Sequence, residues 1–158
     1  MNFITNSGFE TNTSGWSVFG GGATIASSTD QAKSGTHSLL ITGRTQTYQG
    51  PQYSVLSVST PGTSYRLSLW GRLSASTPTG SLIVTLRYTC TGGSSPGDSF
   101  SQWVGSTPAS TSSWTELAAV KTFPSCTGGG TMTAATIYVE SQTTSLSFYI
   151  DDVVLSAP

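Results

Sequence analysis

Charged side chains are scarce in this chain of 158 residues. Lys and Arg together number six and Asp and Glu seven, which gives a charged fraction of 8% and a formal net charge of −1. An average globular domain carries roughly 25% charged residues. With so few cations, no basic stripe is available to bind the phosphates of a nucleic acid or the surface of an anionic membrane. We therefore expect neither a nucleic acid nor a membrane as a partner.

Histidine and cysteine are equally rare. The chain has one histidine and two cysteines, and neither cysteine lies in a Cys-x-x-Cys motif, which excludes a Cys/His zinc cluster. Cys90 and Cys126 each follow a strand-like segment, so the sequence favours a disulfide between them over two free thiols. Disulfides are typical of oxidising compartments. We therefore expect a secreted protein.

Long apolar runs and helical periodicity are missing as well. Apolar stretches such as that within residues 151–155 are far too short to span a bilayer. Polar residues follow Met1 at once, so no signal peptide is expected at this end of the sequence.

Ser, Thr and Gly, the last with 18 residues, are abundant where an average domain has charged residues. Short alternating segments recur between turn sequences rich in Gly, Pro and Ser, a pattern typical of strands. Strands are expected at residues 22–27, 37–42, 65–71, 81–88, 99–105, 115–123, 135–141 and 146–156. Short strands without helices predict a single all-β domain over residues 1–158, a jelly-roll β-sandwich of two antiparallel sheets.

Six short motifs occur in an order typical of one family. They are NSGFET…SGW (6–16), KSGTHSLLITGR (33–44), TYQGP (47–51), PGTSYRLSLWGR (61–72), IYVES (137–141) and FYIDDVVL (148–155). On these motifs the chain resembles the family 4/9/22 group of carbohydrate-binding modules, and most closely the xylan-binding family 22. The resemblance implies a non-catalytic module that binds a β-1,4-linked polysaccharide such as xylan, or secondarily β-glucan, in a groove across one sheet. It also implies a covalently tethered glycoside hydrolase, and we expect a monomer.

Sugar rings pack their flat C–H faces on aromatic side chains and bind polar groups at the rim, so a saccharide site needs both. The resemblance implies a stacking ring at Tyr48, and Gln49 beside it is an amide partner. Strand alternation sends Tyr138 and Glu140 to the face opposite their aliphatic neighbours. The resemblance implies that these two side chains also contact the sugar.

A second stacking aromatic is implied near residues 99–105. Phe100 is favoured over Trp103, because a residue three positions further on faces the other side of a regular strand. The arginine that the family uses in its N-terminal third has no counterpart in this chain. Arg87 is the candidate substitute, and Arg44 is as well suited to brace the loop that follows it. The resemblance assigns three further aromatic residues to the core: Trp16, Trp70 and Trp114.

The resemblance also implies a structural calcium ion. Calcium is bound by several oxygens, which are often a mixture of carboxylates and backbone carbonyls. Glu10 and Asp151 match the family's carboxylate ligands, and the backbone oxygens of Ser34 and His37 would complete the cage. In this arrangement the imidazole of His37 takes no part.

Catalysis is not expected. A glycosidase needs two carboxylates that face each other across the scissile bond. If Glu10 and Asp151 bind calcium, Glu140 has no obvious partner, and His37 lies outside any nucleophile-elbow motif. Two alternatives remain open: a structural or adhesive extracellular β-sandwich, and a small polysaccharide lyase that uses a Tyr and an Arg.

Overall fold

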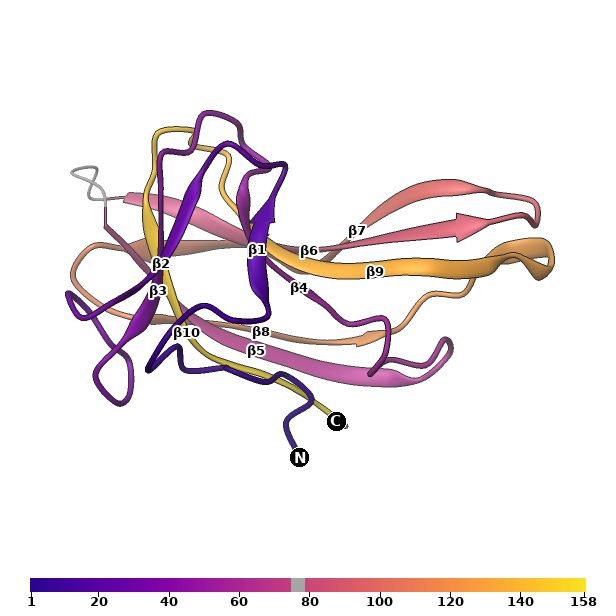
Figure 1. Cartoon of the computed structure of the whole chain (residues 1–158), viewed down its shortest axis with the longest axis horizontal. Helices are drawn as coiled ribbons and strands as arrows, with labels where there is room; N and C mark the ends of the chain where they lie inside the picture. Colours follow the sequence, from indigo (N-terminus) through magenta and orange to yellow (C-terminus); the bar gives the residue numbers. More distant parts are fainter. Residues whose placement is uncertain (75–78) are drawn as a thin grey trace.

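Two five-stranded antiparallel sheets form this protein in a computed structural model that describes residues 1–74 and 79–158 (Figure 1). The first sheet contains, in spatial order, β1 (Trp16–Phe19), β4 (Gly50–Ser54), β9 (Thr131–Glu140), β6 (Thr79–Thr91) and β7 (Gly97–Ser110). The second contains β2 (Thr24–Ser28), β3 (Ser38–Thr42), β10 (Phe148–Ser156), β5 (Ser64–Leu73) and β8 (Thr115–Thr122). Within the described residues the only helical segment is the 3₁₀ turn η1 (Thr127–Gly129). The predicted jelly-roll β-sandwich is confirmed.

The core lies between the two sheets and follows from strand alternation. Leu67 and Leu69 on β5 belong to the same fully buried cluster as Val84 and Leu86 on β6. Burying one such side chain stabilises the fold by roughly 1.5–3 kcal/mol. Because successive side chains point to opposite faces, the residues between them on β6, such as Thr85, lie on the outer face of the first sheet. That outer face is where the candidate site is found.

The eight expected strands correspond to β2, β3 and β5 to β10. The expected set lacks β1 and β4, which have only four and five residues. Strand β4 begins with Gly50-Pro51, a dipeptide typical of turns. These short segments become strands through pairing, with β1 on β4 and β4 on β9.

Of the three tryptophans that the sequence analysis assigned to the core, one lies there. Trp16 is buried in the core, as expected. The prediction for Trp70 is wrong, because alternation turns it to the outer face of the second sheet, where the Lys33 ammonium lies 4.3 Å from the ring centroid. Trp114 is also half-buried rather than in the core, and its ring centroid lies 6.4 Å from that of Tyr149.

Arg44 lies buried beneath the loop between β3 and β4, with only 5% of its surface exposed. Its guanidinium donates hydrogen bonds to six backbone carbonyls: those of Gln46 (3.4 Å), Thr47 (2.8 Å), Gln49 (2.7 Å), Ser141 (2.9 Å), Thr143 (2.8 Å) and Leu146 (3.1 Å). Burial lowers the pKa of Arg44, and the nearby charge of Glu140 opposes that shift. The interpretation that Arg44 braces this loop is confirmed.

The disulfide between Cys90 and Cys126 is present, as the sequence predicts. It joins the end of β6 to the residue that precedes η1. In Figure 1 this end of the β6–β7 hairpin and the start of β9 project beyond the second sheet. The bond therefore ties the projecting hairpin to the chain that enters β9.

The two chain ends lie side by side (Figure 1). The backbone N–H of Phe3 donates to the carbonyl of Leu155 at 2.8 Å, and the side-chain amide of Asn2 donates to the carbonyl of Val153 at 2.9 Å. The described residues include no helix with the length and apolarity that a bilayer crossing requires.

Replacing Arg44 with Lys should lower the free energy of unfolding by about 2–4 kcal/mol. A lysine ammonium has at most three donors, so several of the buried carbonyls that Arg44 now satisfies would lose their partner. Urea unfolding measures the effect. The matched control is Arg66→Lys, because Arg66 forms an exposed ion pair with Glu116 at 3.2 Å and such pairs contribute about 0–1 kcal/mol. Equal stability of the two variants would contradict the bracing role of Arg44.

Candidate functional site

Four aromatic rings gather on the outer face of the first sheet, and we call them the aromatic cluster: Phe19, Tyr48, Phe100 and Tyr138. Phe19 is stacked on Tyr138, with ring centroids 3.9 Å apart and planes 4° from parallel. Tyr48 and Phe100 each lie edge-to-face with Phe19 at 6.4 Å, with interplanar angles of 85° and 87°. The cluster therefore joins residues from β1, β7, β9 and the loop before β4.

Tyr48 projects from the loop that Arg44 braces, and 43% of its surface is exposed. Its ring lies against Gly20, where a Cβ atom would come within 2.5 Å of Tyr48 Cε2. Gly20 also has a φ of +79°, a conformation that L side chains rarely adopt. A glycine at this position therefore gives the tyrosine ring room to lie against the turn after β1.

Tyr138 and Glu140 lie on the outer face of β9, as alternation predicts. Tyr138 is only 3% exposed because Phe19 covers it, and burial together with the charge of Glu140 raises its pKa to about 12. The Glu140 carboxylate accepts a hydrogen bond from the hydroxyl of Thr85 at 3.2 Å. Burial raises the pKa of Glu140, while the Thr85 hydrogen bond and the charge of Arg44 oppose the shift. Glu140 thus presents a partly buried acceptor beside the rings.

Phe100 and Trp103 lie on opposite faces of β7. Phe100 is 58% exposed and belongs to the aromatic cluster. Trp103 is 4% exposed, packs in the core, and donates its indole N–H to the carbonyl of Ala119 at 3.2 Å. The prediction of Trp103 as a sugar-binding candidate is therefore corrected, and the preference for Phe100 agrees with its position.

Arg87 pairs across the ladder with Phe100, so the two share the outer face. The guanidinium lies 3.0 Å from a carboxylate oxygen of Asp98. The other Asp98 oxygen accepts a hydrogen bond from the hydroxyl of Thr89 at 2.7 Å. The Thr89 and Arg87 hydrogen bonds lower the pKa of Asp98. Arg87 is therefore close to the aromatic cluster, but its charge is neutralised.

Gln49 does not lie where the sequence predicts. Its surface is 4% exposed, and its side-chain oxygen accepts hydrogen bonds from the backbone N–H groups of Thr45 at 2.7 Å and Gln46 at 3.0 Å. Its amide nitrogen donates to the carbonyl of Gly21. The amide therefore holds the loop beneath Tyr48 closed, and its hydrogen-bonding groups are already used.

Phe19 is the site residue that the sequence reasoning misses. It lies at the end of β1, one of the two strands that the sequence does not predict. The available signal is its place immediately before Gly20, Gly21 and Gly22, a run of glycines that predicts a turn and therefore the end of a strand. Pairing of Phe19 with Gly50 in the β1–β4 ladder brings it to Tyr138.

The residues expected to bind calcium lie at the opposite sheet, around the loop before β3. Asp151 is fully buried, and its carboxylate accepts backbone N–H groups of Lys33 at 2.8 Å, Ser34 at 3.3 Å and Asp152 at 2.8 Å. Burial raises the pKa of Asp151 to about 6. Within the described part of the chain, no basic side chain forms an ion pair with it. A buried carboxylate with no cationic side-chain partner fits a hard cation such as Ca²⁺, which prefers oxygen ligands.

Glu10 contacts the other end of the same loop. Its carboxylate accepts the backbone N–H groups of Thr36 at 3.0 Å and His37 at 3.3 Å, and hydrogen bonding to Thr36 lowers the pKa of Glu10. The His37 imidazole is not idle, because its Nδ1 lies 3.5 Å from a Glu10 oxygen. Among the described residues, no group of three or more His, Cys, Asp or Glu side chains is placed to hold a metal ion. Any calcium cage would therefore depend on backbone oxygens as well.

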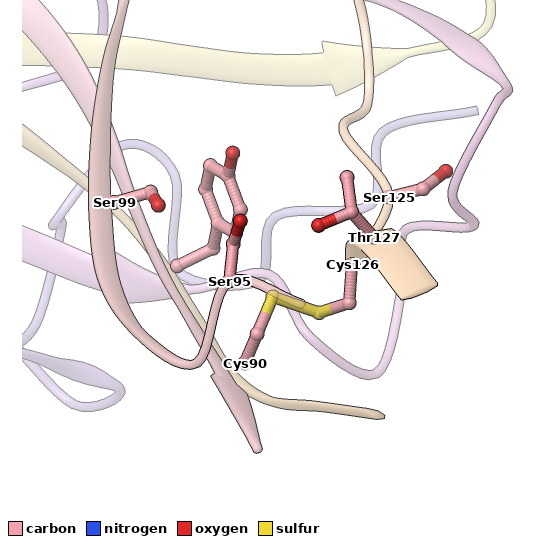
Figure 2. Close-up of a pocket in the computed structure, with 7 residues that line it drawn as sticks. Cys90, Ser95, Ser99, Ser125, Cys126 and Thr127 are labelled. Carbon is pink, nitrogen blue, oxygen red and sulfur yellow. A yellow bond between two sulfur atoms is a disulfide. The ribbon is translucent and has the colours of Figure 1, made fainter. Parts of the chain in front are cut away.

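A separate pocket lies beside the disulfide (Figure 2). It is lined by Tyr88, Cys90, Ser95, Ser99, Ser125, Cys126 and Thr127. Tyr88 alternates with Arg87 and so lies on the sheet face opposite the aromatic cluster. Its lining residues include no carboxylate or histidine, so this pocket offers hydroxyl groups but no acid–base pair.

Comparison with known proteins agrees with the fold. A family model described as carbohydrate binding domain, for module families 4 and 9, matches residues 1–146. The chain is 36% identical over 157 residues to endo-1,4-beta-xylanase A of Thermoanaerobacterium saccharolyticum, a match that covers 99% of this chain and 13% of the xylanase. It is 35% identical over 156 residues to exoglucanase XynX of Acetivibrio thermocellus, covering 98% of this chain and 14% of that protein. The chain thus spans a small part of these relatives.

Among solved structures, the chain is similar to the C-terminal family 22 carbohydrate-binding module of Clostridium thermocellum Xyn10B. The TM-score is 0.86 at 22% sequence identity, over 99% of this chain and 92% of that module. At this identity the likeness shows a shared fold, and the family model and the xylanase relative carry the assignment. The chain belongs to the carbohydrate-binding domain family of modules 4 and 9.

Proposed function

We propose that this chain is a non-catalytic module that binds the β-1,4-linked backbone of xylan across the aromatic cluster. The observation that carries the proposal is the exposure of Tyr48 and Phe100, at 43% and 58%, beside the acceptor Glu140. Exposed rings with a few polar groups at their rim suit the C–H faces and hydroxyls of pyranose rings. Tyr48 and Phe100 stack on sugar residues, and Glu140 accepts hydrogen bonds from sugar hydroxyls.

The electrostatics of the face favour a neutral stretch of polysaccharide. The Arg87 charge is compensated by Asp98 at 3.0 Å, and the Arg44 guanidinium is buried and occupied by backbone carbonyls. Glu140 adds a partly buried carboxylate next to the rings. An anionic substituent on the polysaccharide would meet this carboxylate without a free cation to balance it. A backbone free of uronic acid is therefore the preferred ligand.

Binding serves to hold a tethered glycoside hydrolase on its substrate. Two observations support this: the xylanase relative is several times longer than this chain, and the two ends of the module lie together through contacts such as that of Phe3 with Leu155. The disulfide supports secretion, and we expect the module to act as a monomer. The exposed rings favour a binding module over a purely structural sandwich, which has no use for clustered aromatic side chains on its surface.

Tyr48→Ala should weaken binding of xylohexaose about tenfold, because a lost stacking contact is worth on the order of 1–2 kcal/mol. The melting temperature should change little, since 43% of the Tyr48 surface is already exposed and the side chain lies outside the core between the sheets. Isothermal titration calorimetry and thermal unfolding measure the two effects. The matched control is Val120→Ala, an exposed apolar residue on the second sheet with 57% of its surface accessible. If Tyr48→Ala bound xylohexaose as tightly as the parent, the assignment of this face as the sugar-binding site would be wrong.

The charge argument predicts a preference for neutral ligands. The parent should bind xylohexaose more tightly than a xylo-oligosaccharide of the same length that carries glucuronic acid. Asp98→Asn should reduce this preference by a factor of about two to five, because freeing one exposed cation is worth up to about 1 kcal/mol. Calorimetry at low salt with both sugars measures the ratio. If the parent prefers the acidic sugar, the view of a face without free cations is wrong.

We also propose a structural calcium ion held by Asp151 and Glu10 with backbone oxygens of the loop that contains Ser34 and His37. The full burial of Asp151 without a cationic side chain partner among the described residues supports it. Such an ion would neutralise the buried carboxylate and clip the N-terminal segment, the loop before β3 and the bulge between Asp151 and Val154 together.

Removing calcium with a chelator should lower the melting temperature of the parent, because the buried carboxylate would lose its compensating charge. Asp151→Asn should lose this sensitivity and should bind xylohexaose as the parent does. Asp30→Asn, which alters an exposed carboxylate, is the control and should keep the sensitivity. A parent with the same melting temperature in chelator and in calcium would argue against the ion.

A further inference from the structure

Phe19 occupies the centre of the aromatic cluster. Among the described residues it is the ring in contact with all three others, at 3.9 Å from Tyr138 and 6.4 Å from both Tyr48 and Phe100. The strand and turn that carry it are anchored locally, since Gly20 directly after Phe19 lies under the Tyr48 ring. Any ligand that touches both exposed rings must therefore pass over or beside Phe19.

The stacking of Phe19 on Tyr138 decides which ring a ligand meets. Tyr138 is 3% exposed, and Phe19 lies parallel to it at van der Waals distance. Phe19 remains partly exposed even though one of its faces is covered. Its accessible surface consequently lies on the side away from Tyr138. The aromatic surface offered between Tyr48 and Phe100 thus belongs to Phe19.

The two exposed rings stand nearly perpendicular to Phe19, at 85° and 87°. Neither ring stacks on Phe19, because stacked rings are nearly parallel. A flat pyranose ring that lies on Phe19 would have an aromatic wall toward Tyr48 and another toward Phe100. Phe19 has no hydrogen-bonding group, so its contact with a sugar depends on the C–H face alone.

We infer that Phe19 is the central sugar-stacking platform of this module, and that Tyr138 is a positioning residue that backs the Phe19 ring. The inference rests on the proposed function and specifies which residues carry it. The ligand that suits this platform is a neutral pyranose residue in the interior of the polysaccharide chain, because neighbouring residues on both sides then reach Tyr48 and Phe100. The opposite arrangement is a gate, in which Phe19 swings away and Tyr138 contacts the sugar.

Phe19→Ala distinguishes the two arrangements. As a platform, its loss should weaken binding of xylohexaose at least fivefold, since removing an aromatic contact typically costs about tenfold in affinity. As a gate, its loss should leave affinity unchanged or increase it, which would overturn the inference. Phe19→Leu keeps an apolar cover on Tyr138 but lacks a flat face, and it should show a loss of similar size. If the Ala variant unfolds, the Leu variant decides between the two arrangements by the same measurement.

Tyr138→Phe tests the positioning role. It retains the stacked ring and removes only the hydroxyl, so affinity for xylohexaose should stay within a factor of two of the parent. A loss as large as that of Phe19→Leu would mean that binding needs the Tyr138 hydroxyl, directly or through Glu140, which contradicts a role limited to backing the Phe19 ring. Failure of the proposed function would differ from failure of this inference, because in that case the parent itself would not bind xylohexaose in calorimetry. If the parent binds and Tyr48→Ala weakens it while both Phe19 variants bind normally, only the inference fails.

Discussion

The proposed binding face depends on the hydrogen bonds that the buried guanidinium of Arg44 donates. A buried charge without compensating partners costs several kcal/mol, and Arg44 meets this requirement with carbonyls from two separate segments, the loop at 46–49 and the turn at 141–146. Satisfying the arginine therefore fixes the path of the loop. Gln49 completes the loop from within, and Tyr48 projects from it as one wall of the aromatic cluster.

The charged groups around the rings are also paired or partly buried. Arg87 is neutralised by Asp98, and Glu140 is partly buried and hydrogen-bonded to Thr85. What the face offers a ligand is therefore flat apolar surface with a few hydrogen-bonding groups. That combination suits a neutral sugar chain, whose rings are apolar on their faces and polar at their edges. At the second sheet the negative charge of Asp151 is instead buried, which suits a cation.

The sequence was informative where local rules decide the outcome. Strand alternation correctly predicted that Tyr138 and Glu140 lie on the outer face. It also predicted that Phe100 and Trp103 lie on opposite faces of their strand. The strand-like segments before Cys90 and Cys126 indicated the disulfide between them. The sequence was uninformative where pairing with a neighbouring strand determines whether a segment becomes a strand. Strands β1 and β4 are short, and one begins with Gly-Pro, so they become strands only because neighbouring strands supply their hydrogen bonds. Phe19 was missed because it lies on one of them.

The sequence by itself determined the class of fold, the family and the candidates on long strands, because period-two patterning and turn residues act within a few positions of one another. Only the tertiary structure decided which side chains reach solvent. Gln49 and Tyr138 look available in the sequence, yet a loop closes around the first and a ring from β1 covers the second. Trp70 looks like a core residue, yet it lies on the outer face of its sheet. Burial at these positions depends on contacts between segments far apart in the chain, and residue type and strand period do not specify those contacts.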